Sequence, residues 1–210
     1  MTKPNLVEIV CVADRSGSMS MIKSDAIGGF NHFLEQQKKL PGDARFTLAL
    51  FDHEYEIAVD AVDIQHVPLL NETTYCPRGS TALLDAIGRT VATVGERLSK
   101  TPAYARPSKV IVAILTDGLE NASKEYTRSK IFEMIKHQRE VYSWEFIFLA
   151  ANQNAIQEGA SLGINGKDSF NFNATGLGVR TAYRCMAQSV ASYRTNADPQ
   201  VQELSDTGKK

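Results

Sequence analysis

Three small oxygen-bearing side chains stand two residues apart just after the first apolar run of the chain. In the sequence DRSGSMS, Asp14, Ser16 and Ser18 alternate with Arg15 and Gly17. A carboxylate and two hydroxyls in this pattern could cap a helix, supply a nucleophile or coordinate a metal ion. In extended backbone alternate side chains point to one side, so the three would face together while Arg15 and Gly17 point away. Gly17 would let the backbone bend around an ion.

Two further segments carry oxygen ligands of the same kind. TDGLEN (residues 116–121) follows an apolar run and contains Asp117, and RGST (residues 78–81) contains Ser80 and Thr81. No histidine or cysteine joins this set. Hydroxyl and carboxylate oxygens suit a hard divalent cation such as Mg²⁺, Mn²⁺ or Ca²⁺, and not zinc.

Short apolar runs predict the strands that must position these segments. They cover residues 6–13, 46–51, 110–115 and 144–150. Each run is nearly continuous and rich in β-branched or aromatic residues, as in parallel strands covered by helices on both faces. Residues 54–62 alternate and carry charge after a short turn, which predicts a hairpin ending in an antiparallel edge strand.

Apolar residues at three- or four-residue spacing predict helices between the strands. The helices are centred on residues 22–37, 83–98, 131–135, 155–162 and 179–193, and a last short strand on residues 169–172. This alternation favours an α/β fold: a Rossmann-like, doubly wound, mostly parallel sheet with one antiparallel edge strand and helices on both faces. We expect one domain over residues 4–195 and a polar C-terminal tail over residues 196–210.

The bulk composition argues against several function classes. The 210 residues are 43% hydrophobic and 22% charged, with a formal net charge of −1. This balance suits a globular domain and shows no basic excess, so we expect neither nucleic acid nor a membrane as partner. The cysteines form no CxxC pair, the first residues lack a signal-peptide core, and no apolar run approaches the ~20 residues of a membrane span, so we expect a cytoplasmic protein.

The D-x-S-x-S sequence after the first strand, a threonine in a later loop and TDG after a central strand together resemble the von Willebrand factor A domain. In that family these loops form a metal-ion-dependent adhesion site. The resemblance covers most of the chain and implies that Asp14, Ser16, Ser18, Thr81 and Asp117 hold a divalent cation, with the hydroxyls as direct ligands and the aspartates acting partly through water. It also implies a protein partner that offers a carboxylate to the metal. Without a secretion signal, a stand-alone intracellular form of the bacterial or phage type is expected.

Enzymes remain the alternative class. A Mg²⁺-dependent phosphotransferase or phosphatase of haloacid-dehalogenase type also has an aspartate after its first strand, but it needs a second aspartate two residues later. Ser16 occupies that position and cannot act as a general acid near neutral pH. A serine hydrolase needs a G-x-S-x-G elbow, which neither Ser16 nor Ser18 has. We therefore favour a metal-dependent protein-binding module without catalytic activity.

Structural roles are expected for other polar residues near the same rim. Ser80 could replace Thr81 as a ligand, and either could cap the second helix. Asp85, one turn further, could support the metal site or interact with the helix dipole. Glu120 and Asn121 are expected to be solvated loop residues.

Two smaller patterns have structural explanations. Gly28 and Gly29 inside the first helix would each cost about 1 kcal/mol against alanine, which close packing of that helix on the sheet would explain. Asn152 or Asn154, after the fourth apolar run, could line the rim but is expected to cap the next helix.

Overall fold

A computed structural model describes residues 3–151 and 154–195. Its centre is a six-stranded sheet in the order β3-β2-β1-β4-β5-β6. The strands are β1 (Lys3–Asp14), β2 (Asp43–Phe51), β3 (Tyr55–Asp63), β4 (Pro107–Thr116), β5 (Glu145–Ala151) and β6 (Ser169–Phe172). Neighbours pair in parallel except β2 and β3, which are antiparallel and leave β3 at one edge. The predicted sheet class is confirmed. The predicted polar tail, residues 196–210, lies outside the described residues.

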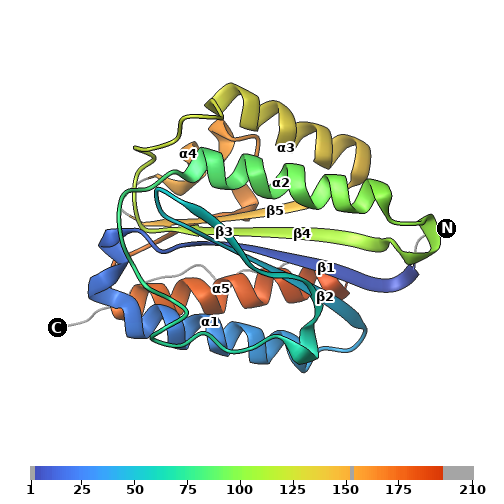
Figure 1. Cartoon of the computed structure of the whole chain (residues 1–210), viewed down its shortest axis with the longest axis horizontal. Coiled ribbons are helices and arrows are strands. Elements are labelled where there is room, and N and C mark those ends of the chain that lie inside the picture. The colour runs from blue at the N-terminus through green and yellow to red at the C-terminus, as the bar shows by residue number, and fades with distance from the viewer. Residues whose placement is uncertain (1–2, 152–153, 196–210) are drawn as a thin grey trace.

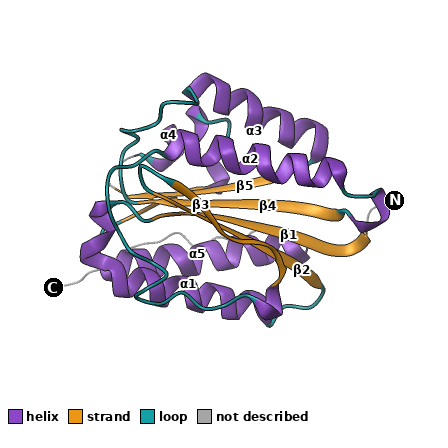
Figure 2. Ribbon diagram, in the orientation of Figure 1, coloured by secondary structure: helices purple, strands orange, loops and turns teal. Residues whose placement is uncertain are grey.

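Helices cover both faces of this sheet (Figures 1 and 2). The α-helices are α1 (Lys23–Lys38), α2 (Leu83–Lys100), α3 (Arg128–Tyr142), α4 (Ala155–Ser161) and α5 (Gly176–Thr195). Short 3₁₀ helices are η1 (Gly17–Ile22), η2 (Ile64–His66), η3 (Ala103–Ala105) and η4 (Gly166–Asp168). Helices α1 and α5 lie on one face, and α2 and α3 on the other. None of the described helices combines the length and the apolar content needed to cross a bilayer.

The central strand β1 shows why its sequence is apolar without alternation. Ile9 and Cys11 belong to the core cluster that contains residues of α1 and α5. Val10 and Val12 point the other way, into the cluster that contains residues of α2 and α3. Both faces of the strand are therefore buried, as the continuous run of apolar residues predicts.

The starts of two helices are capped by side chains of the preceding residue. Thr127 precedes α3, and its side chain accepts a hydrogen bond from the Lys130 amide. Asn154 precedes α4, and its side chain accepts one from the Gln157 amide. Capping by Asn154 is confirmed, whereas Asn152 lies outside the described residues. Both caps satisfy backbone donors that a first helical turn leaves unpaired.

The two adjacent glycines of α1 have different surroundings. A Cβ atom added to Gly29 would lie 2.6 Å from Cδ2 of Tyr183, whereas one added to Gly28 would meet nothing within 4 Å. Tyr183 belongs to α5, so Gly29 serves the packing of two helices against each other and not the packing of α1 on the sheet.

This contrast gives a matched pair of substitutions. We expect Gly29→Ala to destabilise the protein by about 1–3 kcal/mol, because the new methyl group must displace a buried ring. Gly28→Ala should stabilise it by about 0.5–1 kcal/mol, because alanine lowers the entropy cost of an exposed helical position. Urea unfolding measures both; equal effects of the two substitutions would contradict this packing.

Candidate metal centre

The candidate site lies where the carboxyl ends of β1 and β4 meet. These strands are neighbours in the sheet, with Ala13 opposite Leu115. The chain continues from β1 to β2 on one side and from β4 to β5 on the other, so the strand order reverses between them. In open α/β sheets such a switch point opens a crevice in which ligands bind.

Asp14, the last residue of β1, is the most deeply buried of the predicted ligands. Its side chain is 0% exposed. One carboxylate oxygen accepts a hydrogen bond from the Ser16 amide at 2.6 Å, and the other accepts one from the Thr116 hydroxyl at 2.6 Å. The Tyr75 hydroxyl donates to the Asp14 carbonyl oxygen. The carboxylate is therefore fixed by donors from its own loop and from the neighbouring strand.

A chain of oxygens leads from Asp14 toward the surface. The Ser16 and Ser18 hydroxyl oxygens are 3.1 Å apart, and the Ser18 hydroxyl donates to Oδ1 of Asp117 at 2.7 Å. Ser16 and Asp117 are buried, whereas Ser18 is exposed. The cluster therefore opens to solvent at Ser18.

The arrangement of the two serines differs from the predicted one. The backbone is extended at Ser16, but the 3₁₀ turn η1 begins at Gly17. Ser18 thus reaches Ser16 because the chain turns, and not because an extended strand alternates. Ser16 stands at the N-cap of η1 without a side-chain capping bond, so its hydroxyl is not used to start that turn.

Thr81 borders the same space from a third loop. A Cβ atom added to Gly118 would lie 3.0 Å from the Thr81 hydroxyl oxygen and 3.9 Å from that of Ser18. Glycine at position 118 keeps this space open. Asn121 anchors the Thr81 backbone through two hydrogen bonds. The side-chain Oδ1 of Asn121 accepts from the Thr81 backbone amide at 2.9 Å, and the backbone amide of Asn121 donates to the Thr81 carbonyl at 3.1 Å.

The neighbouring hydroxyl faces elsewhere. Ser80 is exposed. It lines a separate hollow together with His53, Asp85 and Arg89. Of the two candidates in RGST, the structure therefore places the Thr81 hydroxyl, and not that of Ser80, beside Gly118 and Ser18.

The two carboxyl groups are costly to keep charged in this position. Burial raises the pKa of Asp14 to about 6, against the lowering effect of hydrogen bonds from Thr116 and Ser16. Burial also raises the pKa of Asp117, against the hydrogen bond from Ser18. The nearest basic residue in sequence, Arg15, pairs with Asp52 instead. Two buried carboxylates, three hydroxyls and an opening to solvent are a donor set that a hard dication fits.

The predicted caps of α2 are wrong. The N-cap is Ala82, without a side-chain cap, so neither Ser80 nor Thr81 performs this role. One amide of the first turn is instead satisfied from the TDGLEN loop: Leu84 N donates to Oε2 of Glu120 at 2.9 Å.

Glu120 and Asn121 were predicted to be solvated loop residues, but both also form hydrogen bonds with the protein backbone. Besides the Leu84 amide, the Glu120 carboxylate accepts the Ala122 and Ser123 amides at 2.9 and 2.8 Å. Together with the Asn121 contacts to Thr81, these bonds tie the TDGLEN loop to the start of α2. Sequence spacing contained no signal for the bonds to Leu84 and Thr81, because these partners are 36 and 40 positions away.

Asp85 has a role that the sequence did not predict. Its carboxylate accepts three backbone amides, those of Lys124, Glu125 and Tyr126, at 2.8–2.9 Å. A buried carboxylate with three amide donors fixes the segment that leads from the TDGLEN loop to α3. It therefore acts on the loop and not on the candidate ligands directly.

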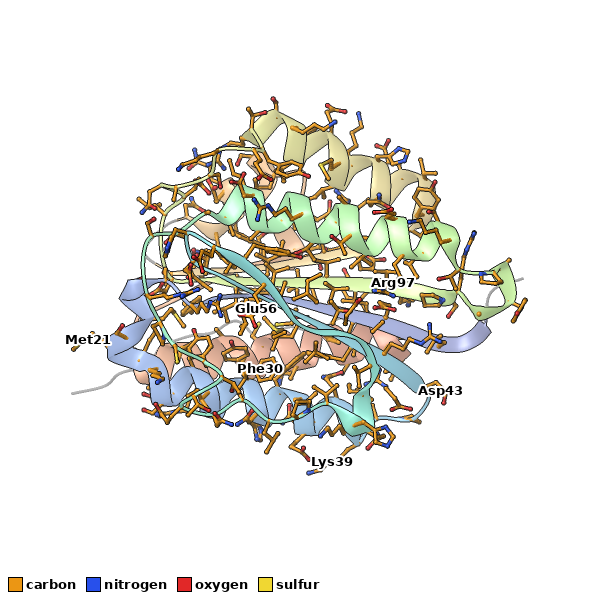
Figure 3. The ribbon with its side chains drawn as sticks, in the orientation of Figure 1. Met21, Phe30, Lys39, Asp43, Glu56 and Arg97 are labelled. Carbon is orange, nitrogen blue, oxygen red and sulfur yellow. The ribbon has the colours of Figure 1, made fainter. Side chains whose placement is uncertain are left out.

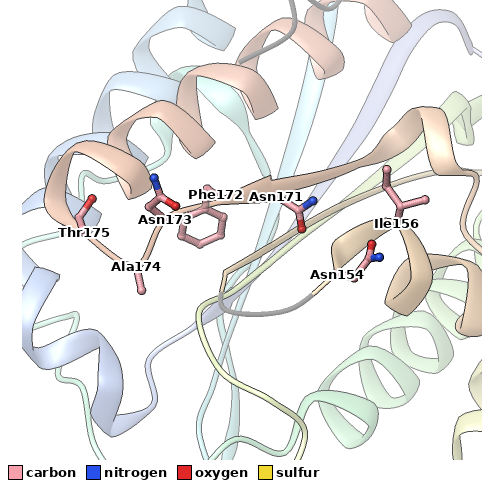
Figure 4. A pocket seen from close by; sticks show the side chains of 7 residues that line it. All are labelled: Asn154, Ile156, Asn171, Phe172, Asn173, Ala174 and Thr175. Carbon is pink, nitrogen blue, oxygen red and sulfur yellow. The ribbon is translucent and has the colours of Figure 1, made fainter. Parts of the chain in front are cut away.

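A second hollow lies farther along the same edge, between the starts of α4 and α5 (Figure 4). Its lining residues are Asn154, Ile156, Asn171, Phe172, Asn173, Ala174 and Thr175. Oδ1 of Asn171 accepts the Ala155 amide at 2.8 Å, and Oδ1 of Asn154 accepts the Gln157 amide. These amides stabilise the beginning of α4, and none of the predicted ligands lines this hollow.

The sheet order and the helices on both faces define the chain as having the fold of a von Willebrand factor A domain, which comparison with solved structures supports. The byssus protein "proximal thread matrix protein 1" of mussel, with a "zinc occupied MIDAS motif", matches with a TM-score of 0.61 and 13% identity over 90% of this chain and 48% of that one. The vWF domain of the pilus tip protein Mfa5 from Porphyromonas gingivalis matches with a TM-score of 0.61 and 13% identity over 98% and 99%. A von Willebrand factor type A protein from Catenulispora acidiphila matches with a TM-score of 0.58 and 15% identity over 88% of this chain and 42% of that one.

These likenesses define the fold and no more, because the identities are low. The chain spans less than half the length of the mussel and Catenulispora structures. No family model matches the sequence, and no curated protein matches it significantly.

The amide contacts of Asp85 give a prediction. We expect Asp85→Ala to lower the free energy of unfolding by more than about 2 kcal/mol, because three amides lose a charged acceptor in a largely buried position. Glu125→Ala removes only an exposed pair with Arg89 and should change stability little. Thermal unfolding compares the two; equal losses would show that Asp85 does not organise this loop.

Proposed function

We propose that this chain is a metal-dependent protein-binding module. In this proposal a divalent cation, Mg²⁺ or a similar hard ion, is held by Asp14, Ser16, Ser18, Thr81 and Asp117, and a protein partner binds there through a carboxylate. The observation that carries the proposal is the run of hydroxyl and carboxylate oxygens from Ser16 through Ser18 to Asp117, at the switch point of the sheet and open to solvent.

The contacts indicate which of the five residues would bind the ion directly and which would support them. The Thr81 and Ser18 hydroxyls both face Gly118, and the Ser16 hydroxyl lies 3.1 Å from that of Ser18, so these three would be the direct ligands. Both Asp14 oxygens already accept hydrogen bonds, so Asp14 would orient the loop and contribute charge from behind. Asp117 holds the Ser18 hydroxyl in place. When bound, a hard dication keeps coordination positions occupied by water, and one of these can be taken by an incoming carboxylate.

The geometry argues against the phosphotransferase alternative. A nucleophilic aspartate must present a free oxygen to the phosphorus atom. Asp14 is fully buried, and both its oxygens are engaged. Ser16, at the position where that class needs an acid, contacts Ser18. These contacts support a ligand-holding role for Asp14 and Ser16 over group transfer.

The surface beside the opening is partly apolar. Met21, in η1 after Ser18, is 92% exposed and projects from the left end of the molecule in Figure 3. Leu119, two residues after Asp117, is 60% exposed. A partner that offers a carboxylate between these side chains would gain apolar contact on either side, so we expect its binding segment to place apolar residues next to the acid.

Metal titration tests the proposal. We expect millimolar Mg²⁺ or Mn²⁺ to raise the unfolding temperature, because an ion at 100 times its Kd stabilises the folded state by about 2.7 kcal/mol. Asp117→Ala should abolish the shift, because it removes charge and the anchor of Ser18. Ser80→Ala is the matched control and should keep it, since that hydroxyl lines another hollow.

Two outcomes would count against this function. A wild-type protein whose stability does not respond to either ion would remove the metal site. Metal-dependent turnover of a phosphate ester that is lost in Asp14→Asn would favour the phosphotransferase instead.

A further inference from the structure

Arg15 stands between two proposed ligands and turns away from them into the protein. Its side chain is buried. Its Nε lies 3.0 Å from Oδ2 of Asp52, and its Nη1 lies 2.7 Å from Oε2 of Glu56. Asp52 follows the last residue of β2, and Glu56 lies on β3, so Arg15 connects the DRSGSMS loop to the β2–β3 hairpin.

Asp52 is the acceptor on which this connection converges. Its side chain is 0% exposed. The oxygen that accepts Nε of Arg15 also accepts Nε of Arg78, again at 3.0 Å. The other oxygen accepts the Glu54 amide at 2.7 Å and lies 3.1 Å from Nδ1 of His53. One buried carboxylate therefore holds two guanidinium groups, one from each side of the proposed metal site.

Backbone hydrogen bonds join the same segments. The Arg15 amide donates to the Phe51 carbonyl at 2.7 Å, and the Arg78 amide donates to the Arg15 carbonyl at 2.9 Å. Next to them, the Gly17 amide donates to the Gly79 carbonyl at 3.0 Å. The loop of Ser16 and Ser18 and the loop of Thr81 thus lie against each other, with Asp52 behind both.

The carbonyl of Asp52 continues this support to the start of α2, because it accepts the Ala82 amide at 2.8 Å. Ala82 is the residue after Thr81. Gly79 permits the close approach: its φ is +65°, and an added Cβ would lie 2.0 Å from Nδ1 of His53. The Asp52 carbonyl and the His53 ring therefore also border the loop that carries Thr81.

We propose that Asp52 is a positioning residue of the metal site, which sets the separation between the serine loop and the Thr81 loop through Arg15 and Arg78 without touching the ion. The inference rests on the proposed metal-binding function and adds the group that would preorganise it. A charged carboxylate is needed, because one of its oxygens accepts both guanidinium groups while the other accepts the Glu54 amide, and the neutral side chain of asparagine has only one acceptor oxygen.

Asp52→Asn tests this role, because it keeps the shape and removes the charge. We expect Mn²⁺ affinity, measured by calorimetry on folded protein, to fall about 10-fold or more, as when groups that orient metal ligands are lost. Glu8→Gln is the matched control. Glu8 is another fully buried carboxylate, and it forms an ion pair with Arg97 at 2.8 Å. Arg97 is labelled in Figure 3, to the right of Glu56. This variant should lose stability but bind Mn²⁺ within about twofold of wild type.

Hydrogen exchange without metal separates this inference from the metal proposal. In metal-free Asp52→Asn, and not in Glu8→Gln, we expect faster exchange at the amides of both Gly17 and Arg78. If wild type binds no Mn²⁺ yet these amides respond, the metal function fails and the coupling of the loops stands. Unchanged exchange at these two amides, or wild-type Mn²⁺ affinity in Asp52→Asn, would overturn the role of Asp52.

Discussion

The hydrogen bond from the Thr116 hydroxyl to the Asp14 carboxylate is the contact on which the rest of the site depends. It exists because β1 and β4 pair in parallel, in a register that ends both strands at the same level. Parallel pairing brings together two residues that are 102 positions apart in sequence. With Asp14 held from the neighbouring strand, the two loops that follow these strands begin side by side. Ser18 can then reach Asp117 at 2.7 Å.

Around this contact, polar residues fall into two groups with different tasks. One group borders the open space and consists of small oxygen-bearing side chains. The other group builds the loops that carry them: Asp52 holds two arginines, Glu120 accepts one amide of α2, and Asp85 accepts amides before α3. The second group consists of acids just after β2, within the TDGLEN loop and in the first turn of α2. These carboxylates bind groups of the protein itself, so the exposed end of the site is left for a ligand.

Much of the fold could be predicted from the sequence, because burial leaves a local record. Continuous apolar runs such as residues 6–13 mark strands covered on both faces, and β1 fills both core clusters. The candidate ligands Asp14, Ser16, Ser18 and Asp117 could also be predicted to meet, since the carboxyl ends of parallel strands share one edge.

The supporting contacts could not be predicted, because they join residues with no common spacing. Arg15 was expected to point away from the site, and nothing in DRSGSMS indicates that it would reach Asp52. Asp85 is the first-turn acid of a helix in sequence terms, yet its partners are amides thirty-nine to forty-one positions later. Ser18 was predicted to lie beside Ser16 because alternate residues of an extended strand face the same side. In the structure it lies there because a 3₁₀ helix begins at Gly17. Local patterns record burial and turns, whereas hydrogen bonds between loops depend on the finished fold.

An anomalous difference map from crystals of this protein grown with Mn²⁺ is the most direct measurement of the central claim. We expect one strong peak at coordination distance from the hydroxyl oxygens of Ser16, Ser18 and Thr81, next to Asp117 and with Asp14 behind it. A peak bound elsewhere on the chain, or no peak at millimolar Mn²⁺ in a lattice that leaves this edge of the sheet open, would contradict the assignment of this cluster as a metal site.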